Sequence, residues 1–134
     1  MKTVLLVEDD KKITLAIGIR LKSMGYEVAS AADAVSAIAQ ARKCKPDVIL
    51  LDINLPGGDG FIVAERLQAL MQTSATPIIF ITASKQSGLK ERARDLGAVA
   101  FLEKPFDATQ LADAIEMSLY SPNIIGDEAM QTAR

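Results

Sequence analysis

Acids, a hydroxyl and an amine follow the short apolar runs of this chain: Glu8, Asp9, Asp10, Asp52, Thr82 and Lys104. Carboxylates held within a few ångström repel and raise one another's pKa unless a cation lies between them. Oxygen ligands without histidine or thiolate favour Mg²⁺ or Mn²⁺, and these ions also accept phosphate oxygens. A carboxylate can take up a phosphoryl group as an acyl phosphate when nearby cations and donors neutralise the charge. The residue types therefore indicate metal-dependent phosphoryl transfer.

Composition limits the alternatives. A chain of 134 residues, 49% hydrophobic and 24% charged, fits one folded domain. No apolar run approaches the roughly 18 residues that cross a membrane or forms a signal-peptide core, so we expect a cytoplasmic protein without a membrane partner. A net charge of −2 gives no support for direct nucleic acid binding. Without histidine, and with Cys44 as the only cysteine, the chain offers no zinc site, internal disulfide or histidine-activated nucleophile.

Hydrophobic periodicity alternates between strand and helix along the chain. Strands are predicted over 3–7, 26–30, 47–51, 78–82 and 98–102. Helices are predicted over 11–24, 34–43, 60–71, 87–96 and 108–120. Expected N-caps are Asp33, Asp59 and Asp107, and Gly97 is expected to end the fourth helix. The second helix is expected to bury Val35, Ala37, Ile38 and Ala41, and the third to bury Leu70 among others.

This alternation predicts a doubly wound α/β fold, in which a five-stranded parallel sheet carries five helices on its two faces. We adopt the flavodoxin-like strand order 2-1-3-4-5 that is common in this class. Its crevice lies at the carboxyl ends of the first and third strands. The acids 8–10 and Asp52 then flank the crevice, and Thr82 and Lys104 reach the same edge.

Each of these residues also has a structural explanation. Asp9 or Asp10 could cap the first helix, and Asp52 could form a turn before a glycine-rich loop. Thr82 suits a strand, and Lys104 could be an ordinary loop lysine. These explanations do not account for four separate strands delivering complementary groups to one edge, so the conjunction favours a functional site.

The segments VLLVEDD, VILLDINLPGGDG, IIFITAS and FLEKPF, in this order and spacing, resemble the receiver domain of two-component response regulators over about residues 1–120. The resemblance implies a Mg²⁺-dependent domain that accepts a phosphoryl group from a histidine kinase or a histidine phosphotransfer protein. By motif position Asp52 is the phosphoacceptor. Glu8 and Asp9 are the acidic pair, with Asp9 and Asp52 binding the metal directly, and Asn54 adds its backbone carbonyl.

The resemblance also assigns the phosphoryl contacts and the switch. Thr82 and Lys104 are expected to hold the phosphoryl oxygens, with a cis peptide between Lys104 and Pro105. Phe101 stands where the family has an aromatic switch residue, often tyrosine, so switching here works through ring packing without a hydroxyl. We expect the surface over the fourth helix, fifth strand and fifth helix to respond to phosphorylation. The loop after Asp52 departs from the family, with Leu55 and Gly58 at positions that often hold methionine.

Residues 121–134 are expected to form a tail or the stub of a linker, following a Ser-Pro break. A freestanding receiver that docks on a downstream protein target is preferred, and a piece of a longer regulator with a separate output domain is the alternative. Homodimer formation is left open. We expect no enzyme activity beyond the chain's own phosphorylation and dephosphorylation.

Three other functions compete. A phosphatase of the haloacid dehalogenase type would need a second acid where Asn54 stands. A flavin-binding module would need a phosphate-cradling loop after the first strand, where this chain has acids. A receiver-like scaffold that is never phosphorylated would not need the complete set of site residues.

Overall fold

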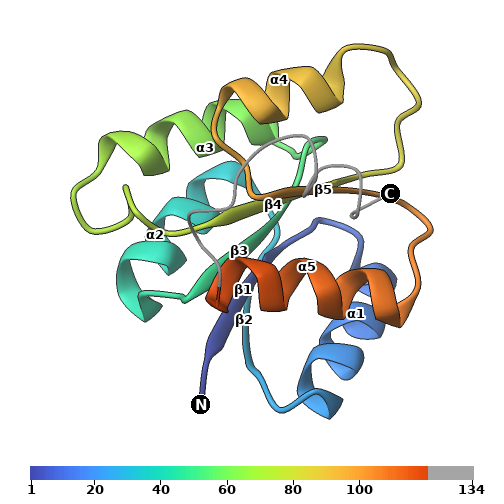
Figure 1. Ribbon diagram of the computed structural model, residues 1–134. Coiled ribbons are helices and arrows are strands. Elements are labelled where there is room, and N and C mark those ends of the chain that lie inside the picture. The colour runs from blue at the N-terminus through green and yellow to red at the C-terminus, as the bar shows by residue number, and fades with distance from the viewer. Residues whose placement is uncertain (121–134) are drawn as a thin grey trace.

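A computed structural model describes residues 1–120 (Figure 1). Strands and helices alternate, as predicted, with shifts of a few residues at some ends. The strands are β1 (Thr3–Val7), β2 (Glu27–Ala31), β3 (Val48–Asp52), β4 (Ile78–Thr82) and β5 (Ala100–Glu103). The helices are α1 (Lys11–Ser23), α2 (Ala34–Cys44), α3 (Gly60–Ala69), α4 (Leu89–Asp95) and α5 (Ala108–Tyr120).

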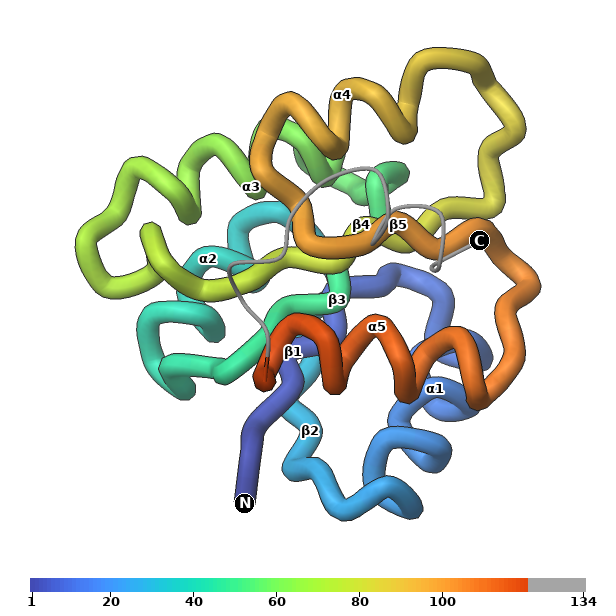
Figure 2. Tube along the Cα trace, in the orientation of Figure 1, coloured from blue at the N-terminus to red at the C-terminus, as the bar shows by residue number. Residues whose placement is uncertain are grey.

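The five strands form one parallel sheet in the order β2-β1-β3-β4-β5, which confirms the predicted topology. Helices α1 and α5 cover one face, and α2, α3 and α4 cover the other (Figure 1). The chain runs from β1 outward to β2, crosses back to β3 and continues to β5 (Figure 2). Its winding therefore reverses between β1 and β3, where ligands bind in this fold class.

The hydrophobic core lies in two layers, one on each side of the sheet. Every residue of β3 and β4 is buried, as expected for parallel strands covered on both faces. Because successive side chains point to opposite faces, Ile49 and Leu51 join the layer under α2 and α3, while Val48 and Leu50 join the layer under α1 and α5. Packing on both sides therefore holds β3 in place from Val48 to Leu51.

Aspartate N-caps fix the starts of three helices. Asp33, Asp59 and Asp107 each accept a hydrogen bond from the backbone N–H three residues further on, at 2.7, 2.9 and 2.8 Å respectively. These are the predicted caps. Gly97, with φ 78°, follows α4 as predicted for a C-terminal glycine. In this fold the helix N-termini lie at the carboxyl edge of the sheet, so the caps also order the loops around the site.

Two expected core positions are wrong. Val35 is 74% exposed because α2 turns by about 100° per residue and buries the face that carries Ala34, Ala37 and Ala41. Leu70 lies just beyond α3 in an extended conformation and is half-buried, because the helix ends at Ala69 and not at residue 71. The predicted element type is correct for Val35, whereas Leu70 was predicted to be helical and lies outside the helix.

The last described residue, Tyr120, ends α5, as predicted for the helix over 108–120. The tail or linker expected at 121–134 lies outside the described residues. Within residues 1–120 no helix is both long and apolar enough to cross a membrane.

Candidate functional site

Three carboxylates meet at the carboxyl edge of the sheet between β1 and β3. One oxygen each from Glu8, Asp9 and Asp52 lies within 4.8 Å of the other two. We call these three residues the acid cluster. Glu8 and Asp52 are only 3% and 5% exposed, whereas Asp9 faces solvent. The predicted convergence of acids from the first and third strands is therefore present in the structure.

Asp10 has a separate role. Its Oδ1 accepts hydrogen bonds from the backbone N–H groups of Lys12 and Ile13, at 2.8 and 3.3 Å, so it is the N-cap of α1. Of the two acids for which capping was considered, Asp10 is the cap. The Asp9 carboxylate belongs to the acid cluster instead.

Lys104 brings a positive charge to the acid cluster from β5. Its ammonium forms ion pairs with Glu8 Oε1 and, at 3.0 Å, with Asp52 Oδ2. The Lys104 side chain is 13% exposed, so water screens these ion pairs weakly. The backbone N–H of Lys104 donates to the carbonyl of Thr82 at 2.7 Å, and the Lys104-Pro105 peptide is cis, as expected. The amine therefore reaches the acids from a well-ordered strand end.

Burial dominates the electrostatics of this group. The pKa of Glu8 is raised from 4.5 to about 7: burial is the largest cause, the hydrogen bond from Lys104 opposes the rise, and the nearby Asp52 carboxylate adds to it. Burial tends to lower the pKa of Lys104, but its bonds to Glu8 and Asp52 outweigh that effect and the pKa is raised. Two carboxylates share the single positive charge of Lys104, so a second cation could balance the negative charge of the acid cluster.

A stability measurement should detect the raised pKa of Glu8. Between pH 4.5 and about 7 the folded protein holds a proton on Glu8 that the unfolded chain has released. We expect this contribution to the free energy of unfolding to be complete below pH 4.5 and to be lost as the pH rises through about 7. Chemical denaturation of metal-free wild type and of Glu8→Gln across this range measures it. Equal pH dependence in the two proteins would contradict the shift.

Thr82 and Phe101 lie on the α4 side of the sheet. Thr82 is fully buried at the end of β4, and its Oγ1 accepts the backbone N–H of Ser84 at 3.0 Å. Phe101, on β5, is 3% exposed and packs in the core layer under α3 and α4. Together with residues 84–90, between β4 and the start of α4, it also lines a cavity of about 210 Å³. The ring thus has adjacent space to move into.

Asn54 is exposed, two residues beyond Asp52. Its backbone N–H donates to Asp52 Oδ1 at 3.0 Å. This bond orients the Asp52 carboxylate, with Oδ1 toward the loop and Oδ2 toward Lys104. The sequence analysis predicted only that the Asn54 carbonyl binds the metal; it did not predict this hydrogen bond to Asp52.

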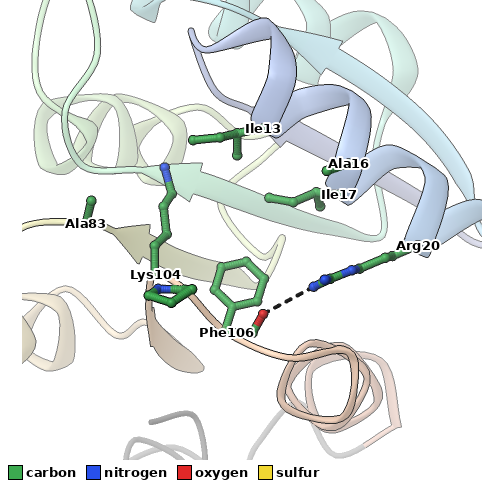
Figure 3. Close-up of a pocket in the computed structure, with 8 residues that line it drawn as sticks. Ile13, Ala16, Ile17, Arg20, Ala83, Lys104 and Phe106 are labelled. Carbon is green, nitrogen blue, oxygen red and sulfur yellow. Dashed lines mark hydrogen bonds between the residues drawn. The ribbon is translucent and has the colours of Figure 1, made fainter.

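A groove beside the site was missed by the sequence analysis. It lies between α1 and the loop from β5 to α5, and its volume is about 400 Å³ (Figure 3). Ile13, Ile17 and Phe106 line it, and Lys104 stands at one end. Arg20 also lines it and donates to the Phe106 carbonyl at 3.2 Å. Residues 86 positions apart form this contact, and no local pattern signals it.

The fold and the site together define a class. A flavodoxin-like parallel sheet holds three carboxylates and one lysine at the point where its winding reverses, with a buried threonine on the neighbouring strand. The chain matches the response regulator receiver domain family over residues 4–116. It belongs to this family, whose members act in two-component signalling.

The relatives agree with this assignment. The chain is 37% identical over 119 residues to the transcriptional regulatory protein PdtaR of Mycobacterium tuberculosis, which covers 88% of this chain and 57% of PdtaR. Among solved structures, the chemotaxis protein CheY4 of Vibrio cholerae is similar with a TM-score of 0.80 and 34% identity, covering 87% of this chain and 97% of CheY4.

A third relative bears on the metal. The receiver domain of the sensor histidine kinase PA1611 from Pseudomonas aeruginosa has a TM-score of 0.81 and 31% identity, covering 88% of this chain and 97% of that domain. That structure holds a magnesium ion coordinated in the active-site cleft. The chain described here spans little more than half the length of PdtaR, so its output and partners are matters for proposal.

Proposed function

We propose that this receiver accepts a phosphoryl group on Asp52. The observation that carries the proposal is the position of Asp52, which ends a buried strand within reach of two acids and an ammonium. Its Oδ1 is held by the Asn54 N–H and its Oδ2 by Lys104, so the carboxylate has a fixed orientation before any donor arrives. Fixed orientation is the main requirement of phosphoryl transfer, which depends on positioning and charge neutralisation.

The acid cluster fits a divalent cation. Its donors are all oxygens, which suits Mg²⁺, with Mn²⁺ as an alternative. Glu8, Asp9 and Asp52 would hold the ion, with the carbonyl of Asn54 as the further ligand that the family pattern assigns. When bound, the ion supplies charge neutralisation for the phosphoryl oxygens. The magnesium in the PA1611 receiver supports this assignment.

The chain's own residues then have distinct roles. An oxygen of Asp52 attacks phosphorus, the bond from phosphorus to the donor imidazole nitrogen breaks, and that nitrogen retains the electron pair. The Lys104 ammonium, released from Asp52 Oδ2, pairs with a phosphoryl oxygen, and the Thr82 hydroxyl donates to another. The product is an aspartyl phosphate with a charge near −2.

We propose that the new charge is sensed through Thr82 and Phe101. Movement of Thr82 toward the phosphoryl group would free space behind it, and the Phe101 ring has a neighbouring cavity on the α4 side. The surface of α4, β5 and α5 would then change its population of conformations and its affinity for a downstream target or output domain.

Helix α1 is a suitable surface for the phosphodonor. It begins next to the acid cluster, and Leu15 and Ile19 on it are 65% and 60% exposed. Its charged residues are all basic: Lys11, Lys12, Arg20 and Lys22. Receiver domains of this family interact with histidine kinases, and we propose that a kinase or a histidine phosphotransfer protein docks here with an apolar, acidic surface.

The competing functions rank lower. The chain belongs to the receiver family, and no observation favours a dehalogenase-type phosphatase or a flavin module. We propose a signalling phosphoacceptor in the cytoplasm that catalyses only its own phosphorylation and dephosphorylation. A scaffold that is never phosphorylated is the remaining alternative, and the following experiment separates it from the proposal.

The test is the intact mass of the wild-type protein after incubation with a small acyl phosphate. With Mg²⁺ we expect the mass to rise by one phosphoryl group, and with a chelator we expect no change. A phosphohistidine-containing donor protein should give the same adduct. If the mass stays constant with Mg²⁺ and both donors, the scaffold alternative is correct.

Removing one metal ligand should uncouple Mg²⁺ from stability. Mg²⁺ at ten times its Kd should add about 1.4 kcal/mol to the free energy of unfolding of wild type. Asp9→Asn should gain much less, and its metal-free form should be at least as stable as wild type because one repelling carboxylate is gone. Urea denaturation with and without Mg²⁺ measures both effects. An equal gain in the two proteins would mean that Asp9 is not a ligand.

A further inference from the structure

Gly60, the first residue of α3, lies against the strand end that carries Asp52. Its N–H donates to the Ile53 carbonyl at 2.6 Å. A Cβ at this position would lie closest to the Asp52 carbonyl oxygen, 2.9 Å from Ile53 Cα and 3.0 Å from the Asp52 carbonyl carbon. These are backbone atoms, so no change of rotamer could relieve the overlap. The φ of Gly60 is not positive, so its backbone conformation does not require glycine. The requirement comes from the close approach of the Asp52 and Ile53 backbone.

Helix α3 cannot easily move away to make room. Its Phe61, Val63, Ala64 and Leu67 are at most 1% exposed in the core. A shift of the helix would disturb these contacts, and close-packed cores resist such shifts. The peptide between Asp52 and Ile53 is the last of β3, and the loop that follows it carries glycines at 57 and 58. This peptide therefore shifts more easily than a helix with four buried side chains.

We infer that Gly60 is a positioning residue for Asp52. Because it lacks a Cβ, the end of β3 can pack directly on the start of α3, and the Asp52 carboxylate comes within reach of Lys104 and the Asn54 N–H. The inference rests on the proposed function of Asp52, since it concerns how that same site is assembled. It assigns a functional role to a residue that touches neither donor nor metal.

The test compares Gly60→Ala with wild type. The variant should fold, with the helical circular dichroism of wild type. In the metal-free protein the amide resonance of Asn54 should move, because this N–H donates to Asp52 Oδ1. We expect the Kd for Mg²⁺ to rise about 10- to 100-fold, as when residues that orient metal ligands are replaced. At saturating Mg²⁺ the phosphorylation rate should still fall about 100-fold.

Two control variants separate positioning from general destabilisation. Asp59→Ala removes the N-cap of α3 but adds nothing at position 60, so it should lower stability and keep the Asn54 resonance and the Mg²⁺ affinity. Gly18→Ala adds a Cβ that meets no atom within 4 Å, so it should keep the wild-type Asn54 resonance and Mg²⁺ affinity. It should be at least as stable as wild type, because alanine is favoured over glycine inside a helix.

The inference is overturned if Gly60→Ala keeps the wild-type amide resonances and Mg²⁺ affinity, or if its changes equal those of Asp59→Ala. It is also overturned if Gly60→Ala does not fold, because the cost would then fall on the core and not on Asp52. Failure of the proposed function has a different signature. In that case wild type takes up no phosphoryl group, but the Mg²⁺ affinities and amide resonances of wild type and the variants can still be measured and compared.

Discussion

Asp52→Asn should take up no phosphoryl group, even with Mg²⁺ and an excess of acyl phosphate. The asparagine keeps an oxygen that can accept the Asn54 N–H, so the loop should hold its conformation. It has no carboxylate to form the acyl phosphate. Intact mass measures the result directly, with wild type showing the added phosphoryl group in parallel.

Asp47→Asn is the matched control for this variant. Asp47 accepts the Thr3 N–H at 2.8 Å at the opposite end of the sheet, so it tests the loss of an aspartate away from the site. It should be phosphorylated as wild type is. An adduct on Asp52→Asn would show that another residue accepts the phosphoryl group, and the proposed site would be wrong.

Lys104→Met should slow phosphorylation by roughly 10²- to 10³-fold, the usual effect of removing one group that stabilises developing charge. The same change leaves Glu8 and Asp52 buried without their ammonium. At pH 8, above the raised pKa of Glu8, we expect the free energy of unfolding of the metal-free protein to fall by about 1–3 kcal/mol. Quenched-flow or time-resolved mass measurements give the rate, and urea denaturation gives the stability.

Lys2→Met provides the control for the loss of a lysine. Lys2 lies 4.0 Å from Asp47 in an exposed pair far from the acid cluster, and such pairs contribute little to stability. Its phosphorylation rate and stability should stay near those of wild type. If Lys104→Met is phosphorylated at the wild-type rate, the ammonium has no part in the reaction.

Local rules were sufficient for most of the fold. Asp33, Asp59 and Asp107 were correctly predicted as N-caps because a cap needs only the backbone three residues away. Apolar runs predicted the buried strands for a similar reason, since both faces of a parallel strand are covered. Val35 was wrongly assigned to the core, because the direction of the buried face of α2 depends on which residues the sheet presents to it.

The site was predicted in part. The strand-end positions of Glu8, Asp52 and Lys104 followed from the sequence and the assumed strand order. The sequence left open whether Asp9 or Asp10 caps α1, and the structure gives that role to Asp10. The groove between α1 and the loop from β5 to α5 was missed because it forms between elements far apart in the chain.

The sequence by itself determined the alternation of strands and helices, the caps, the receiver family and the residues that gather at one edge of the sheet. Only the tertiary structure decided how these residues meet. Lys104 bonds to Asp52 and Glu8 across 52 and 96 positions of the chain, and Gly60 contacts the strand end across a loop. Such contacts depend on how helices and strands pack, which no short stretch of sequence encodes.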